Sequence, residues 1–194
     1  MKKIQDHYFK EARKQGYVAR SAFKLEEMDR KFRLLRRGQH VIDLGCAPGS
    51  WLQYAAKKVL PEGSLTGVDL KQVKIQFPES VRIFQSDISM LEESILASSR
   101  FDLVLSDMAP DTTGIPSVDS QRSYDLNSQA LSFAQRHLKP GGTLVLKAFQ
   151  GEPLNRLKSE IRPCFESFKL FKPKSSRSES VEIFVLGFGL LPQS

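Results

Sequence analysis

Short apolar runs recur along the chain from residue 39 onward, and segments of helical periodicity separate them. Runs rich in Val, Leu, Ile and Phe and bounded by Gly, Pro or Asp are typical of buried strands. Seven strands are expected, over residues 39–44, 64–69, 81–85, 101–107, 143–148, 165–171 and 182–186. Helices are expected between them, over about 50–59, 89–97, 119–138 and 153–162.

This alternation predicts a Rossmann-like α/β fold, with a mainly parallel sheet and helices on both faces. The last two strands share a polar loop that is too short for a crossover helix, so the last strand is expected to be antiparallel. Two further helices are expected over 4–14 and 22–34, with Ser21 capping the second. We expect a single domain, with an N-terminal extension over 1–37 and a core over 38–194.

The composition, the lengths of the apolar runs and the spacing of the cysteines indicate a soluble globular protein. Apolar residues make up 40% of the 194 residues and charged residues 26%, as in soluble globular proteins. No apolar run approaches the roughly 20 residues of a membrane-spanning helix, and the N-terminus lacks the apolar region of a secretory signal. Cys46 and Cys164 form neither a disulfide framework nor a metal-ligand spacing. We therefore expect a protein of the cytoplasm, with an organelle as the alternative, that binds neither a membrane nor a metal. We also expect it to be a monomer.

The net charge of +7 is concentrated at the two ends of the chain. Residues 1–37 carry 12 Lys or Arg against 5 Asp or Glu, whereas residues 38–154 carry 10 against 13 and residues 155–194 carry 7 against 4. Such a surface suits a polyanion such as RNA, although solvated helix faces are the alternative for any charge run. The basic set is Lys2, Lys3, Lys10, Arg13, Lys14, Arg20, Lys31, Arg33, Arg36 and Arg37, with Lys172, Lys174 and Arg177 near the other end.

Candidate ligand-binding residues follow the expected strands, because ligands of such sheets bind outside the carboxyl ends of the strands. The residues at these ends are the turn Gly45 to Gly49, Asp69, Asp87, Asp107 and Lys147. The turn lacks the G-x-G-x-x-G pattern that holds a dinucleotide pyrophosphate. Asp69 follows near the spacing at which a carboxylate binds a ribose diol.

A nucleoside ligand without a pyrophosphate fits both observations, and S-adenosylmethionine is the candidate. The alternative is a structural turn in which Asp69 caps a strand end. Trp51, early in the following helix, is expected either in the core or as a wall of the cofactor site.

Five segments in order along the chain carry a resemblance. They are Tyr17 to Leu25 (YVARSAFKL), Asp43 to Trp51 (DLGCAPGSW), Ser106 to Pro110 (SDMAP), Val145 to Gly151 (VLKAFQG) and Ser175 to Glu182 (SSRSESVE). Together they resemble the FtsJ family of RNA ribose 2'-O-methyltransferases. The resemblance implies a class I methyltransferase fold and a catalytic tetrad on Lys24, Asp107, Lys147 and Glu182. It also implies that the cofactor-binding residues are Gly49, Trp51, Asp69, Asp87 and Asp107. The sequence departs from the family pattern at Cys46, Ser50 and Val181, outside the tetrad.

The chemistry implied by the resemblance is methyl transfer to a ribose hydroxyl, with Lys147 as general base. Asp107 would orient Lys147, and Lys24 and Glu182 would place the ribose. Asp107 also argues against a base-amine methyltransferase, because the double proline and aromatic residue usual in those enzymes are missing. The resemblance further implies a uridine in the A-loop of 23S rRNA, in the large ribosomal subunit, as the target. A tRNA or an mRNA cap is the alternative substrate, and a non-catalytic RNA-binding assembly factor is the alternative class.

Overall fold

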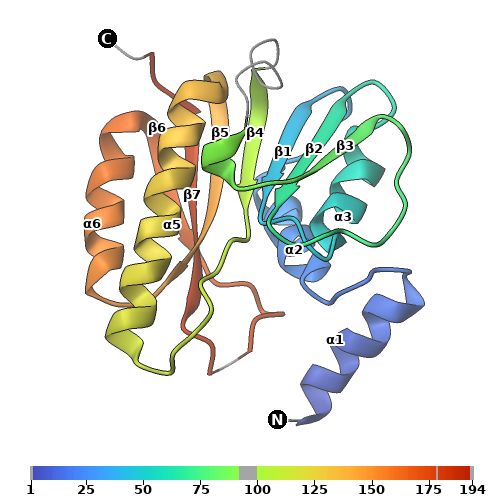
Figure 1. The fold of residues 1–194 in the computed structure, drawn as a ribbon, viewed down its shortest axis with the longest axis horizontal. Coiled ribbons are helices and arrows are strands. Elements are labelled where there is room, and N and C mark those ends of the chain that lie inside the picture. The colour runs from blue at the N-terminus through green and yellow to red at the C-terminus, as the bar shows by residue number, and fades with distance from the viewer. Residues whose placement is uncertain (1, 92–99, 178, 193–194) are drawn as a thin grey trace.

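The computed structural model describes residues 2–91, 100–177 and 179–192 and contains a seven-stranded sheet (Figure 1). The strand order is β3-β2-β1-β4-β5-β7-β6. Only β7 is antiparallel to its neighbours, β5 and β6, and the other paired strands are parallel. The mainly parallel sheet with one antiparallel strand is therefore confirmed. Its strands are β1 (His40–Leu44), β2 (Ser64–Asp69), β3 (Val81–Gln85), β4 (Phe101–Ser106), β5 (Leu138–Phe149), β6 (Phe165–Phe171) and β7 (Glu182–Leu190).

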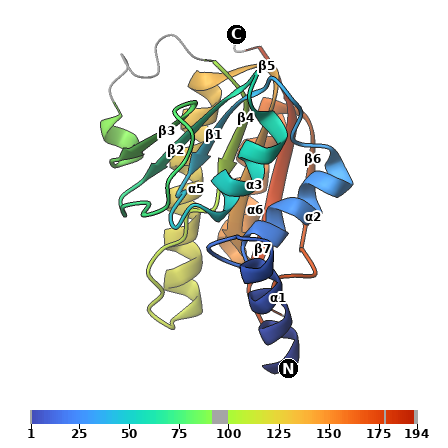
Figure 2. The ribbon, with the colours of Figure 1, turned by 90° about the vertical axis from the view of Figure 1, so that its right-hand side faces the viewer.

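Helices cover both faces of the sheet, as Figures 1 and 2 show. The α2 and α3 helices pack on one face in a core that includes Leu25, Met28 and Leu52, and α5 and α6 pack on the other with Phe133 and Leu157. The α1 helix projects from the body beyond the carboxyl ends of the parallel strands (Figure 1). The helices are α1 (Lys2–Lys14), α2 (Ala22–Phe32), α3 (Ser50–Val59), α5 (Pro116–His137) and α6 (Glu152–Ile161), with 3₁₀ turns η1 (Ile88–Met90) and η2 (Arg162–Cys164).

Two strands are longer than the sequence pattern predicts. The β5 strand begins at Leu138, which pairs with Phe101, and an irregularity in register precedes the pairing of Thr143 with Leu103. The β7 strand continues through Gly187, which was expected to end it. A Cβ atom at Gly187 would lie 2.8 Å from the ring of Phe165, so this glycine makes room for an aromatic side chain within the sheet.

Two of the helical expectations are corrected by the structure, and a third is mostly untested. The α5 helix begins at Pro116, three residues earlier than expected, and its Asp119 carboxylate accepts hydrogen bonds from the N–H groups of Thr113 and Gly114. Ser21 precedes α2 but makes no side-chain cap, because its hydroxyl bonds the hydroxyl of Ser50 instead. The helix expected over 89–97 lies mostly outside the described residues.

The position of α2 is fixed by a buried carboxylate. Asp29, 7% exposed, accepts hydrogen bonds of 2.8 Å from the backbone N–H of Leu35 and from the hydroxyl of Tyr54 on α3. Burying a carboxylate is costly unless its oxygens are hydrogen-bonded, and here both are. This bonding ties α2 to α3 and to the segment that enters β1, and it thereby places the N-terminal half of α2 beside the sheet.

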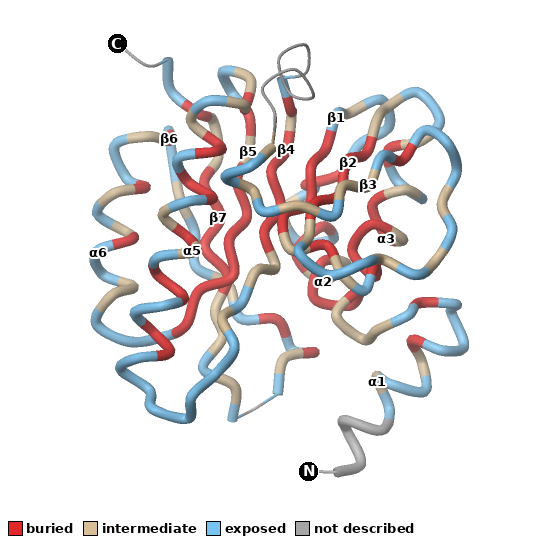
Figure 3. The backbone as a smooth tube through the Cα atoms, in the orientation of Figure 1, coloured by how far each residue is buried: buried red, intermediate tan, exposed pale blue. Residues whose placement is uncertain are grey.

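Figure 3 shows that the buried residues follow the central strands and the inner sides of the helices. None of the helices in the described part of the chain combines the length and apolar character that a membrane crossing requires.

Candidate active site

The sheet register brings the ends of three strands together. Leu44 of β1 pairs with Ser106 of β4, which pairs with Leu146 of β5. The N–H of Asp107 then donates to the carbonyl of Leu44, at 3.1 Å. Because parallel strands present their carboxyl ends at one edge of a sheet, Asp107 and Lys147 lie side by side there.

Lys147 and Asp107 form a buried ion pair at this edge. The Nζ of Lys147 lies 2.8 Å from Oδ1 of Asp107 and donates to the backbone carbonyl of the same residue at 2.6 Å. Only 6% of Lys147 is exposed, and both polar contacts described for its Nζ come from Asp107, the residue that follows β4. Asn127 of α5 supports the strand from the other side, since its Nδ2 donates to the carbonyl of Lys147 at 3.0 Å.

A second ion pair joins α2 to β7. The Nζ of Lys24 lies 2.6 Å from Oε2 of Glu182. Lys147 pairs with Phe184 across the β5–β7 ladder, and Glu182 lies two residues from Phe184, so the side chains of Lys147 and Glu182 share one face of the sheet. The structure therefore brings together all four residues expected to form the tetrad.

The pKa of Glu182 responds to the lysines of both ion pairs, Lys24 and Lys147, which indicates that the two pairs are close together. Burial raises the pKa of this carboxyl, but the charge and hydrogen bond of Lys24, and then the charge of Lys147, lower it to below its ordinary value of 4.5. Glu182 is therefore a carboxylate at neutral pH, and both ammonium groups act on it.

The turn after β1 has the open backbone expected of a ligand-binding loop. Gly45 and Gly49 have φ angles of 77° and 109°, a region that favours glycine. A Cβ atom at Gly45 would lie 2.8 Å from the side chain of Met108, in the loop after β4. One carboxylate oxygen of Asp69 accepts from the N–H of Ala47 and the other from the N–H of Lys71. Asp69 thus braces the turn, and each of its oxygens retains a lone pair for a ligand hydroxyl.

The other two expected cofactor residues lie in different surroundings. Trp51 is 2% exposed, donates from its indole N–H to the carbonyl of Ser21 and packs on Phe184, with ring centroids 5.8 Å apart. Its side chain therefore belongs to the core. Asp87 is exposed beyond the end of β3, the edge strand, where its Oδ1 accepts hydrogen bonds from the N–H and hydroxyl of Ser89.

Asp43 was not among the residues predicted from the sequence. It is fully buried near the end of β1, and neither carboxylate oxygen has a hydrogen-bond partner among the described residues. Burial raises the pKa of Asp43 well above its usual range; the charges of Asp107 and Asp69 raise it further and Lys147 lowers it. The sequence signal that could have identified Asp43 is its charge, because it is the one charged residue in the otherwise apolar run from Val41 to Leu44.

Three carboxyl groups, those of Asp43, Asp69 and Asp107, thus converge around the glycine turn, with Lys147 as the nearby cation. This excess of acidic groups favours a cationic ligand, because a positive charge would stabilise the ionised carboxylates. Within residues 2–91, 100–177 and 179–192, no cluster of His, Cys, Asp and Glu could hold a metal ion.

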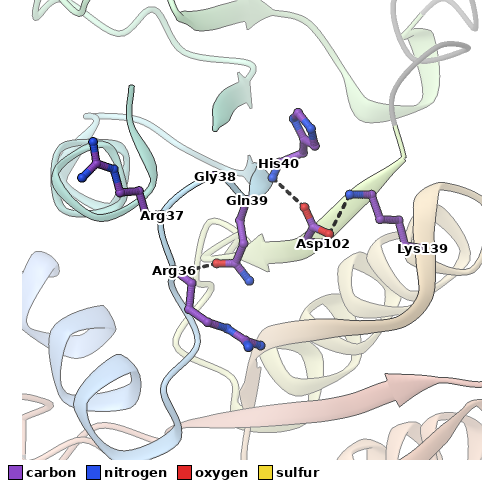
Figure 4. A pocket seen from close by; sticks show the side chains of 7 residues that line it. All are labelled: Arg36, Arg37, Gly38, Gln39, His40, Asp102 and Lys139. Carbon is purple, nitrogen blue, oxygen red and sulfur yellow. Dashed lines mark hydrogen bonds and ion pairs between the residues drawn. The ribbon is translucent and has the colours of Figure 1, made fainter. Parts of the chain in front are cut away.

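A cavity of about 390 Å³ lies at the opposite end of the sheet, where the parallel strands begin (Figure 4). Asp102 occupies its wall, with one oxygen paired to Lys139 at 2.7 Å and the other accepting from the N–H of His40. Arg36 and Arg37 also line this cavity. Arg36 and Arg37, both in the expected basic set, therefore lie at the end of the sheet opposite the ion pairs Lys147–Asp107 and Lys24–Glu182.

The sheet order, the glycine turn and the acidic groups at the strand ends define a Rossmann-like methyltransferase. The comparisons identify the family. The FtsJ-like methyltransferase family matches residues 17–190, so the chain belongs to this family and is a methyltransferase.

Relatives and a solved structure agree with this assignment. The chain is 43% identical to a ribosomal RNA large subunit methyltransferase E of Oleidesulfovibrio alaskensis, over 97% of this chain and 93% of that protein. It is 46% identical to the protein of that name from Desulfatibacillum aliphaticivorans, over 95% and 90%. A crystal structure described as that of a ribosomal RNA methyltransferase from Plasmodium falciparum superposes with a TM-score of 0.81, at 27% identity, covering 91% of this chain and 100% of that one.

The unpaired carboxyl of Asp43 leads to a prediction about stability. The folded protein retains this proton at pH values where the unfolded chain has released it, so Asp43 lowers the free energy of unfolding as the pH rises above about 4. We expect Asp43→Asn to raise the free energy of unfolding of the ligand-free protein by about 1–3 kcal/mol at pH 7. Urea denaturation should show this gain shrinking towards zero at pH 4.

The exposed helical residue Asp125 provides the control, since Asp125→Asn should leave stability nearly unchanged at both pH values. An equal gain from Asp43→Asn at pH 7 and pH 4, or a loss at pH 7, would contradict this account of Asp43.

Proposed function

We propose that this protein transfers a methyl group from S-adenosylmethionine to a ribose 2'-hydroxyl of RNA, and that the target is a uridine in the A-loop of 23S rRNA in the large ribosomal subunit. The observation that carries the proposal is the pair of adjacent ion pairs, Lys147 with Asp107 and Lys24 with Glu182. The names of the relatives support ribosomal RNA of the large subunit as the substrate.

The residues around the glycine turn fit this cofactor. S-adenosylmethionine, when bound, supplies a methyl group on a positively charged sulfur. The orphaned carboxyl of Asp43 and the neighbouring Asp69 and Asp107 form an acidic environment suited to that charge. Gly49 and the backbone before Trp51 would form the wall of the cofactor site, Asp69 would bind the ribose hydroxyls, and Asp87 would bind the adenine.

Lys147 is the proposed general base. A ribose hydroxyl becomes a good nucleophile only as its proton leaves, so a basic group must stand beside it. Lysine is protonated in water at neutral pH, and Lys147 must therefore lose a proton before it can accept one from the 2'-hydroxyl. Asp107 fixes the position of Nζ through two contacts, and Lys24 and Glu182 together would hold the ribose on the same face of the sheet.

The catalytic edge also presents basic residues to RNA. The α1 helix, with Lys10, Arg13 and Lys14, projects from this edge, and Lys172 and Lys174 are exposed in the loop before β7. Such side chains bind phosphates without reading sequence, so RNA shape would determine the target. We propose that the protein acts as a cytoplasmic monomer.

The product of the reaction tests the proposal. Large ribosomal subunits that lack the modification are incubated with tritium-labelled S-adenosylmethionine, and the rRNA is then digested with nucleases. We expect label in 23S rRNA, recovered as 2'-O-methyluridine from the A-loop. Bulk tRNA and capped mRNA serve as competing acceptors. Label on a base nitrogen or carbon would refute ribose methylation, and label in tRNA or cap alone would refute the ribosomal target.

Lys147 and Lys139 provide a matched pair for testing the base. Both are on β5, and each forms an ion pair with an aspartate of the β4 segment, at 2.8 and 2.7 Å. Lys139 lies at the opposite end of the strand, so only Lys147→Ala should affect catalysis. We expect Lys147→Ala to lower the methyl-transfer rate by on the order of 100-fold or more, with cofactor binding retained.

Lys139→Ala should retain the wild-type rate within about threefold, because its only described ion pair is away from the catalytic edge. Rates are measured under single turnover, and cofactor affinity is measured separately by calorimetry. A near wild-type rate for Lys147→Ala would show that Lys147 is not the base.

A further inference from the structure

The loop between β6 and β7 is held against α2 at its middle. The backbone N–H groups of Lys174 and Ser175 donate to the two carboxylate oxygens of Glu27, at 2.7 and 2.8 Å. Ser175 is 3% exposed, which is unusual for a polar residue in a surface loop. Figure 3 shows this segment leaving the end of the sheet and carrying buried positions below α2.

Charge-assisted bonds to both oxygens of one carboxylate are stronger than bonds between neutral groups. Lys172 donates to the carbonyl of Ser180, and the N–H of Ser176 donates to the carbonyl of Pro173, so these two bonds are internal to the loop. At the end of the loop, the carbonyl of Val181 accepts a hydrogen bond from the N–H of Gln150. The hydroxyl of Ser175 has no hydrogen-bond partner among the described residues. Glu27 therefore supplies the hydrogen bonds that are described between the middle of this loop, at Lys174 and Ser175, and the body of the protein.

The α2 helix connects the loop to the candidate active site. Lys24 and Glu27 are three residues apart on α2 and so point from neighbouring positions on one side of the helix. Lys24 holds Glu182, the first residue of β7, while Glu27 holds the loop that leads to it. The α2 helix thus positions both the loop before β7 and the carboxylate of Glu182, which follows that loop.

We propose that Glu27 is a positioning residue for RNA binding: its carboxylate holds loop 172–177 on α2, so that Lys174 and Arg177 are presented beside the ion pair of Lys24 and Glu182. The inference rests on the proposed function, because the partner of this loop is taken to be the phosphate backbone of RNA. Glu27 itself contacts neither substrate nor cofactor and acts through the loop that it holds.

The test compares Glu27→Gln with Glu26→Gln. The side-chain amide that Glu27→Gln introduces would place a donor against one of the two N–H groups, whereas Glu26 accepts no hydrogen bond in the described part of the chain and is the matched control. The rate of trypsin cleavage within the loop measures how firmly the loop is held. Lys174 and Arg177 are its cleavage sites there, because Lys172 precedes Pro173 and is resistant. We expect cleavage in this loop to be about tenfold faster in Glu27→Gln than in the wild type or the control.

Kinetics separate a positioning role from general destabilisation. In Glu27→Gln, we expect the KM for large ribosomal subunits to rise about tenfold, while kcat and the Kd for S-adenosylmethionine stay within about twofold and the Tm stays near that of the wild type. Glu27→Ala, which removes both acceptors without adding a donor, should behave in the same way and serves as the second variant if Glu27→Gln folds poorly.

Wild-type resistance to trypsin in both Glu27 variants would overturn the proposal. Faster cleavage with an unchanged KM for the subunits would overturn the role in RNA binding, and equal losses of cofactor and RNA binding would indicate only a structural role. The trypsin comparison needs neither RNA nor cofactor. If the wild-type protein methylated no RNA, the proposed function would fail, and this comparison would still decide whether Glu27 holds the loop.

Discussion

The register between β1, β4 and β5 is the constraint on which the site depends. It places Asp107 and Lys147 at neighbouring strand ends, where a buried ammonium finds an ion pair of 2.8 Å and a backbone carbonyl at 2.6 Å. A buried lysine without a partner would be strongly disfavoured. The pairing of β4 with β5, which places Asp107 beside Lys147, therefore makes the burial of Lys147 possible. The antiparallel β7 then adds Glu182 to the same face. A slip of one residue in any of these pairings would turn a functional side chain to the opposite face.

The N-terminal segment completes this site because α2 is held at three points. Asp29 bonds to Tyr54 of α3, Lys24 to Glu182, and Glu27 to the loop before β7. Trp51 also helps to hold α2 in place, because its indole N–H donates to the carbonyl of Ser21, just before α2, and its ring packs on Phe184 of β7. The basic residues of the N-terminal extension lie in two places: α1 projects beyond the edge that carries Lys147 and Asp107, whereas Arg36 and Arg37 lie at the opposite end of the sheet.

Local sequence patterns were sufficient for most of the fold. Strands β2, β3 and β6 have the bounds predicted from their apolar runs, because runs flanked by turn-forming residues leave few alternatives. Gly187 was misinterpreted as a strand end because its role is to accommodate Phe165, a contact that no local pattern contains.

The residues of the candidate site were harder to predict from the sequence than the strands were. Lys24 and Glu182 are 158 residues apart, and their association was expected only from the family resemblance. Asp43 was detectable as a charge in an apolar strand, whereas Glu27 and Asn127 act on backbone groups far along the chain and leave no sequence signal.

The central claim is that Lys147 accepts the proton of the ribose hydroxyl, and the pH dependence of single-turnover methyl transfer tests it most directly. With RNA and cofactor saturating, the account predicts a rate that rises about tenfold per pH unit at low pH and then levels off, because the amine must be neutral before it can act. In the Lys147→Ala variant, this rise should be absent from the residual activity. A wild-type rate that is independent of pH between about 6 and 9, with methyl transfer as the measured step, would contradict the assignment of Lys147 as the base.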